Sequence, residues 1–268
     1  MKLRPLGSTG IMVSPLGLGS VKFGRNQGVK YPSPFHLPDD SVIDHLLDLA
    51  LDYSINVIDT APAYGDSELR LGNLLKNRRK NFCLVTKAGE EFENGVSSYD
   101  FSARHIRFSI ERSLNRLRTD YLDVVLIHSD GDDMRIINQS DAIETLQSLQ
   151  KRGLVRAIGM STKTIEGGLA TLQRMDIAMV TYNLNDTREV PVIDYAAKSN
   201  KGILVKKALA SGHLGYRDKG ISDKKEESMV ARSFWHVFAN PGISSVIVGS
   251  ISPEHLVANA RAIAEVLN

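Results

Sequence analysis

The sequence predicts an α/β fold, a (β/α)8 TIM barrel that residues 1–268 form as a single domain. Short β-branched runs alternate with segments of helical periodicity along the whole chain. Each run has a continuous apolar core, which is typical of parallel strands that are covered on both faces. A chain of 268 residues with 42% hydrophobic content is long enough for one such barrel and its core.

Eight apolar runs are the expected strands of this barrel. They cover residues 13–19, 56–59, 82–86, 123–127, 156–159, 178–182, 203–206 and 245–248. The competing architecture is an open, doubly wound sheet, which usually carries a glycine-rich dinucleotide fingerprint after its first strand. Gly17-Leu18-Gly19-Ser20-Val21-Lys22 begins like that fingerprint, but Lys22 stands where the third glycine belongs. This departure favours the barrel.

Capping patterns mark several of the helices between these strands. Ser102 is placed to cap a helix that runs to residue 118. Asp141 and Glu144 have the spacing of a capping box. Ser252 and Pro253 have the order expected at the start of the last helix, a cap followed by proline at the first helical position.

Three other segments are predicted to lie at the ends of the barrel. Residues 1–12 contain the turn-like Gly7-Ser8-Thr9-Gly10 and are expected to form a short β-hairpin that closes the bottom. The aromatic-containing loop 22–40 follows the first strand and should line the mouth of the active site. The polar segment 214–227 is expected to be a loop that leads into a helix over 228–239.

Composition excludes several classes of partner. A formal net charge of +2 is too small to indicate a nucleic-acid partner. Apolar runs stay well below the 18 residues that a membrane span needs, and the N-terminus lacks the apolar region of a signal peptide. The single cysteine, Cys83, lies in an expected strand, so a reducing, cytoplasmic location is expected. The oligomeric state stays open.

Four polar residues follow three successive strands, at the barrel end where catalytic side chains gather. They are Asp59, Tyr64, Lys87 and His128. A tyrosine ordinarily has a pKa near 10, and a nearby ammonium lowers it. Lys87 is expected to be that ammonium and Asp59 to hold it, so that Tyr64 acts as a general acid while His128 orients the substrate oxygen. This chemistry needs neither a nucleophile nor a metal.

Other interpretations of these residues are open on the sequence alone. Lys87 and Asp59 would also make a purely structural ion pair. A lysine at the end of a barrel strand also suits a Schiff-base lyase, for which Lys87 would be the nucleophile. Borohydride trapping with a carbonyl compound distinguishes that lyase from a proton relay.

Several motifs together resemble the aldo-keto reductase family. They are Val57-Ile58-Asp59-Thr60-Ala61-Pro62-Ala63-Tyr64-Gly65, Val85-Thr86-Lys87, Leu122-Asp123-Val124-Val125-Leu126-Ile127-His128, Arg152-Gly153-Leu154-Val155-Arg156-Ala157-Ile158-Gly159-Met160-Ser161 and Ser245-Val246-Ile247-Val248-Gly249-Ser250. The resemblance covers nearly the whole chain in order. It implies a catalytic set of Asp59, Tyr64, Lys87 and His128, and reduction of a small aldehyde or ketone by NADPH, with NADH as the alternative.

The resemblance also implies where the cofactor lies. The expected contacts are Gly19, Ser20, Ser161, Thr162, Lys206, Leu209, Ser211, Gly212, Gly249, Ser250, Ser252, His255 and Asn259. The segment from Gly249 to Ser252 has an independent physical basis, because it runs into a helix N-terminus, where backbone N–H groups and the dipole attract phosphate.

This sequence departs from the family pattern at several cofactor positions. Lys206 stands where an aromatic residue usually stacks on the nicotinamide, Thr162 where asparagine is common and Met179 where glutamine is expected. Gly249 and His255 occupy the places of basic residues that favour NADPH. These departures leave a second interpretation open, a cofactor-binding regulatory subunit with little turnover. Tight cofactor binding without carbonyl turnover would distinguish it.

Overall fold

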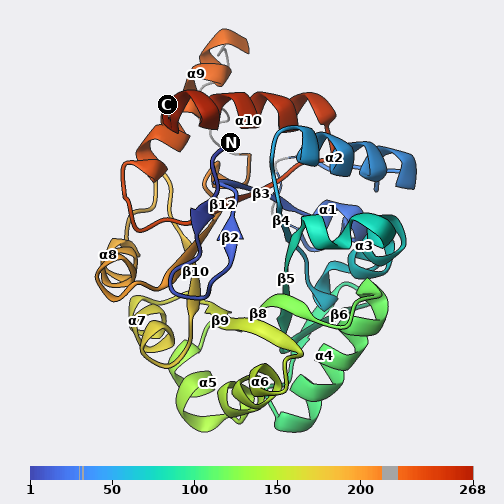
Figure 1. Cartoon of the computed structure of the whole chain (residues 1–268), viewed down its shortest axis with the longest axis vertical. Helices are drawn as coiled ribbons and strands as arrows, with labels where there is room; N and C mark the ends of the chain where they lie inside the picture. The colour runs from blue at the N-terminus through green and yellow to red at the C-terminus, as the bar shows by residue number, and fades with distance from the viewer. Residues whose placement is uncertain (30, 32, 213–222, 268) are drawn as a thin grey trace.

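Eight parallel strands form a closed barrel in the computed structural model, which describes residues 1–29, 31, 33–212 and 223–267. Figure 1 shows the ring of strands with helices around it. In order around the ring, the strands are β10 (Ile177–Thr181), β11 (Gly202–Lys206), β12 (Ser245–Gly249), β3 (Leu16–Gly19), β4 (Val57–Asp59), β5 (Cys83–Ala88), β8 (Leu122–His128) and β9 (Val155–Ser161). The barrel prediction is confirmed, and the open sheet is excluded.

The barrel interior is filled by every second residue of its strands. One buried cluster joins Val57, Val85, Leu126 and Leu204, and Ile247 packs against it. Side chains alternate between the two faces of a strand, so these residues point into the barrel while their neighbours pack under the surrounding helices. Because the side chains alternate, the residue two positions after each of these inward-facing residues also faces inward, at the C-terminal rim of the barrel.

The N-terminal hairpin closes the opposite end. Strand β1 (Arg4–Pro5) pairs antiparallel with β2 (Met12–Val13), and the two lie over the centre of the ring in Figure 1. Leu6 and Ile11 join the interior cluster together with Cys83, the first residue of β5. The predicted hairpin is confirmed, although Val13 belongs to it and not to the first barrel strand.

Helices connect the strands and cover the outside of the barrel. They are α1 (Val21–Gly24), α2 (Asp40–Asp52), α3 (Ser67–Leu75), α4 (Ala103–Leu117), α5 (Asp133–Gln139), α6 (Ala142–Lys151), α7 (Ile165–Arg174), α8 (Val190–Ser199), α9 (Asp223–Phe238) and α10 (Pro253–Leu267). None of the helices in the described part of the chain combines the length and the apolar character that crossing a membrane requires.

The predicted caps meet different outcomes. Ser102 accepts a hydrogen bond from His105 N at 3.3 Å, and Ser252 accepts one from His255 N at 3.1 Å, so both caps are confirmed. The capping box at Asp141 is wrong, since its side chain makes no cap hydrogen bond to the described residues. With φ −87° and ψ 7°, the Asp141 backbone lacks the extended conformation that a capping side chain needs.

Other elements were not anticipated from the sequence. A hairpin of β6 (Glu90–Glu93) and β7 (Val96–Tyr99) follows β5, and α1, which begins at Val21, overlaps the start of the segment 22–40 that is expected to be a loop. Helix α9 starts at Asp223, earlier than the predicted start at residue 228. The part of the predicted loop over 214–222 lies outside the described residues.

Candidate active site

The inward-facing rim positions bring the predicted catalytic residues together. Asp59 follows Val57 by two residues in β4, Lys87 follows Val85 in β5, and His128 follows Leu126 in β8. Each of these three side chains continues an inward-facing row and lines one cavity of about 1300 Å³, which Tyr64 also lines. The barrel geometry therefore concentrates four ionisable groups on one wall.

Tyr64 reaches this wall from a tight turn after β4. A 3-10 turn, Pro62–Tyr64, is followed by Gly65 with φ 60° and ψ −124°, a conformation that side chains rarely adopt. A Cβ on Gly65 would lie 2.1 Å from Gly24 O, and one on Gly24 would lie 2.4 Å from Tyr64 O. These two glycines allow the turn and α1 to pack closely, which fixes the Tyr64 ring beside Lys87.

Lys87 and Asp59 form a buried ion pair. Lys87 Nζ donates to Asp59 Oδ1 at 2.6 Å and to Thr60 O at 2.8 Å, and it lies 4.7 Å from the centre of the Tyr64 ring. Burial alone would lower the pKa of Lys87, but the Asp59 carboxylate and Tyr64 outweigh it and raise the pKa. Lys87 therefore stays protonated, which disfavours it as a Schiff-base nucleophile.

Burial dominates the ionisation of Tyr64 and His128. It raises the pKa of Tyr64 against the opposing effect of the Lys87 ammonium, so the phenol is protonated at neutral pH. The effect of Lys87 has the predicted sign, but the net lowering expected from the sequence does not occur. Burial also lowers the pKa of His128, while the hydrogen bond and charge of Glu90 oppose the change.

Glu90 is a site residue that the sequence interpretation missed. Its Oε2 lies 2.7 Å from His128 Nδ1, and its Oε1 accepts from Ser97 Oγ at 2.6 Å. Burial opposes ionisation of Glu90, but the contacts with His128 and Ser97 prevail and lower its pKa to about 2. Contact at Nδ1 leaves Nε2 as the ring nitrogen available to a substrate oxygen. The sequence signal was weak, since Glu90 lies three residues after Lys87 in the unanticipated hairpin.

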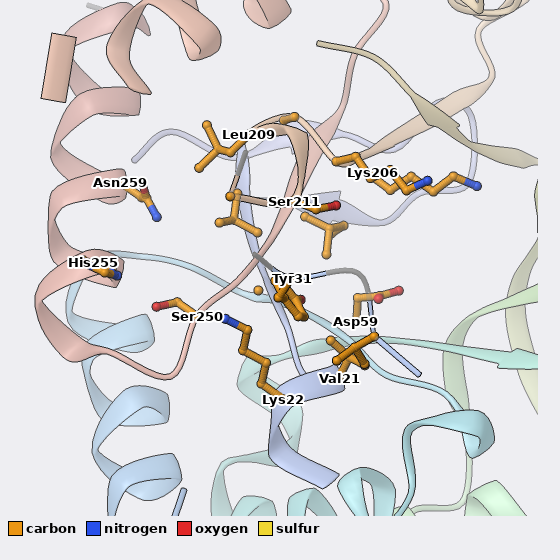
Figure 2. A pocket seen from close by; sticks show the side chains of 18 of the residues that line it. Val21, Lys22, Tyr31, Asp59, Lys206, Leu209, Ser211, Ser250, His255 and Asn259 are labelled. Carbon is orange, nitrogen blue, oxygen red and sulfur yellow. The ribbon is translucent and has the colours of Figure 1, made fainter. Parts of the chain in front are cut away.

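Ten residues expected at the cofactor line the same cavity, which extends from His128 to the first turns of α10. They are Gly19, Ser161, Lys206, Leu209, Ser211, Gly212, Gly249, Ser250, His255 and Asn259. Figure 2 shows His255 and Asn259 along α10, facing the space into which Ser250 points, with Lys206 and Leu209 across from them. The arrangement is a long groove with the four ionisable groups at one end.

Three residues expected at the cofactor lie outside the cavity lining. Ser20 is buried and bonds to Asp59 O at 2.9 Å, so its hydroxyl supports the β4 rim from behind. Thr162 is buried and directs its hydroxyl to Glu189 at 3.4 Å. Ser252 is engaged as the cap of α10. In each case the side chain that the sequence interpretation assigned to the cofactor forms a hydrogen bond with a nearby residue of the protein.

Helix α1 and the loop that follows it contribute a cation and an aromatic wall to the groove. Lys22 Nζ lies 3.9 Å from the centre of the Tyr31 ring and 4.9 Å from that of Phe35, and all three side chains line the cavity. A Cβ on Gly249 would lie 2.9 Å from the Tyr31 hydroxyl, so this loop reaches across to β12. Tyr31 and Phe35 thus line the cavity as expected of this segment, whereas Phe23 is buried in the core.

Comparison with known proteins identifies the class. A model of the aldo/keto reductase family matches residues 15–234. A Pseudomonas aeruginosa structure assigned to the aldo-keto reductases is 53% identical, with a TM-score of 0.88 over 99% of this chain and 95% of that chain. The holo form of an aldo-keto reductase from Bacillus halodurans is 26% identical, with a TM-score of 0.81 over 98% of this chain and 91% of that chain.

A curated relative with a named activity is also similar to this chain. L-Galactose dehydrogenase of Arabidopsis thaliana is 28% identical over 99% of this chain and 89% of its own length. The chain therefore belongs to the aldo/keto reductase family. It is an oxidoreductase of the kind that acts on CH–OH and carbonyl groups, and members of this family typically depend on NADH or NADPH.

Proposed function

We propose that this protein reduces a small aldehyde or ketone reversibly to its alcohol, with Tyr64 as the proton donor. One observation carries the proposal: the Tyr64 ring lies over the Lys87 ammonium, which Asp59 holds in place, on the cavity wall that His128 shares. A protonated phenol beside a fixed cation suits an acid whose conjugate base must be stabilised as it forms.

Each residue then has a defined task. Tyr64 gives its proton to the carbonyl oxygen as the carbonyl carbon gains a hydride. Lys87 stabilises the developing phenolate, and Asp59 keeps Lys87 charged. His128, when its ring is protonated at both nitrogens, orients the oxygen by donating a hydrogen bond from Nε2. Alcohol oxidation uses the same groups in reverse, with the phenolate as base.

A nicotinamide dinucleotide fits the residues present and would supply the hydride. The cavity of about 1300 Å³ exceeds the volume of typical small-molecule pockets, about 300 to 1000 Å³, and so has room for a dinucleotide and a substrate. Gly19 and Gly249 pair across β3 and β12, where the wall presents backbone only. At the far end, the α10 N-terminus and Lys22 offer positive potential for phosphates.

The preferred reductant follows from that far end. We infer NADPH, with NADH as the alternative, because Lys22 and Arg261 line the cavity there and the described lining as a whole carries more Lys and Arg side chains than carboxylates. Glu254 and Glu265 of α10 also line the cavity and act against this preference. Fluorescence titration of the protein with NADPH and NADH measures the preference directly. Equal affinity for the two would refute it.

Replacement of the proton donor tests the mechanism. Tyr64→Phe should reduce kcat for aldehyde reduction about 100- to 10,000-fold while cofactor affinity stays within a few-fold of wild type. Lys22 lies outside the proton relay, so Lys22→Met is a matched variant that should weaken cofactor binding and spare kcat at saturation. Full turnover by Tyr64→Phe with intact cofactor binding would refute the assignment.

The regulatory interpretation has a separate signature. Tight binding of cofactor with negligible turnover across a panel of aldehydes and ketones would favour a cofactor-sensing subunit over an enzyme.

We also place the protein in the cytoplasm, in keeping with its single cysteine, Cys83, which is free and buried. We assign residues 1–268 to one domain, in keeping with barrel strands that span residues 16–249.

A further inference from the structure

Lys206 is a second lysine that faces the reaction chamber. It ends β11 and follows Leu204 of the interior cluster by two residues, so it points inward and lines the cavity. Its Nζ donates to Ser161 Oγ at 2.9 Å and to Thr162 O at 2.7 Å. Ser161 is the register neighbour of His128 across β9 and β8, which places the Lys206 ammonium on the rim beside the predicted site of the substrate oxygen.

The charge on Lys206 lacks a carboxylate partner in contact with it. Both of its hydrogen-bond acceptors are neutral, and among the described residues its Nζ makes no ion pair within 4.0 Å. Glu189, which raises the pKa of Lys206, has its own oxygens engaged by Thr162 Oγ1 and Thr181 N. Lys87, in contrast, is neutralised by Asp59 at 2.6 Å. Lys206 therefore projects a net positive field into the groove.

That field reaches the reacting groups. Lys206 contributes to lowering the pKa of His128, after burial and together with Lys87. If the protein is the reductase proposed above, a hydride must travel about 3 to 3.5 Å to a carbonyl carbon whose oxygen lies between Tyr64 and His128. A nicotinamide that delivers this hydride would therefore be held in the cavity that Lys206 lines together with Tyr64 and His128.

We propose that the Lys206 ammonium makes this protein bind the reduced nicotinamide cofactor more tightly than the oxidised one. The oxidised ring carries a positive charge and the reduced ring is neutral, so an unpaired cation beside the ring destabilises only the oxidised form. Two unit charges about 7 Å apart at an effective dielectric constant of about 20 discriminate by roughly ten- to fiftyfold. Lys206 is thus a specificity-determining residue that favours carbonyl reduction over alcohol oxidation.

Equilibrium binding tests this proposal without turnover. The ratio of the Kd for NADP⁺ to the Kd for NADPH is measured by fluorescence or calorimetric titration at pH 7. The ratio should fall at least tenfold in Lys206→Met and stay within threefold of wild type in Lys206→Arg. Lys198→Met is the matched control, because it removes an exposed lysine of α8 that does not line the cavity and should leave the ratio unchanged.

A pH titration of the wild-type protein is an independent test that no folding defect can confound. Burial lowers the pKa of Lys206 to about 8, so the ammonium is present below that pH and is lost above it. The ratio should therefore be high at pH 7 and fall toward its Lys206→Met value by pH 9.5.

Other ionisable groups face Lys206 from the surrounding elements. They are Glu189 at the start of α8, Lys207 after β11, Asp133 on α5, Lys163 after β9 and His128 at the end of β8.

Because NADP⁺ and NADPH carry the same phosphates, effects on phosphate binding cancel in the ratio of their Kd values. A ratio that is independent of pH from 7 to 10 and unchanged in Lys206→Met would overturn the proposal. Absence of all cofactor binding would instead overturn the proposed function.

Discussion

Removal of the Lys87 ammonium should leave a buried carboxylate without its cation. In Lys87→Met, a side chain of similar length keeps the packing, while Asp59, only 4% exposed, loses the donor at 2.6 Å. Thr60 O also loses a hydrogen bond of 2.8 Å. Breaking a buried pair from one side typically costs about 3 to 5 kcal/mol of unfolding free energy, mostly because one charge stays desolvated. At about 2 to 4 °C per kcal/mol for a chain of this size, Tm should fall by roughly 6 to 20 °C.

A double-mutant cycle separates this effect from lost packing. Asp59→Asn should be destabilising for the same reason as Lys87→Met, whereas the double variant Asp59→Asn/Lys87→Met buries no lone charge and should recover most of the loss. The coupling between the two sites should reach about 3 kcal/mol. Urea unfolding followed by far-UV circular dichroism gives the four midpoints, which are compared at equal m. Single-variant losses that simply add in the double variant would refute a charged, interacting pair.

Three further perturbations test separate parts of the structure. Gly72→Ala should lower the unfolding free energy by about 1 to 3 kcal/mol in urea, because its Cβ would lie 2.0 Å from Arg116 O; an unchanged midpoint would contradict the close approach of α3 and α4. Glu90→Gln should lower the pKa of His128 further, as followed by NMR titration of the imidazole, because the carboxylate that opposes burial is removed; a constant pKa would show that the contact at Nδ1 is absent in solution. Ser252→Ala should cost about 1 kcal/mol in the same urea assay through the lost cap of α10, and no loss would contradict the cap geometry.

The barrel could be predicted from the sequence because its strands are buried on both faces. The runs 123–127 and 203–206 are apolar except for Asp123 and Lys206 at their ends, and β8 and β11 differ from them by at most one residue at each end. The position of the candidate site followed from topology alone, since parallel barrel strands present their carboxyl ends at one rim. The motif spacing and the barrel geometry thus independently predict the same location for the candidate site.

Features that depend on tertiary environment could not be predicted in this way. The β6–β7 hairpin is rich in charged and polar residues, and its strand pairing has no strong signal in the propensities of Glu90-Glu91-Phe92-Glu93. Ser20 and Thr162 have side chains suited to a ligand, yet neighbouring backbone and carboxylate groups engage them. The direction of the Tyr64 pKa shift depends on burial, which the sequence does not state.

The two lysines of the cavity show how partners, and not residue type, decide the chemistry of a side chain. Lys87 and Lys206 both end inward-facing rows of barrel strands, and burial acts on both in the same direction. A carboxylate at 2.6 Å raises the pKa of Lys87, whereas neutral acceptors leave that of Lys206 at about 8. Lys87 is consequently a fixed cation that Asp59 pairs at 2.6 Å and that lies 4.7 Å from the centre of the Tyr64 ring. Lys206 is a cation that is unpaired at neutral pH and lost at mildly alkaline pH. If the first serves the proton and the second the nicotinamide, carbonyl reduction should be favoured below pH 8, and alcohol oxidation should gain most as the pH rises above it.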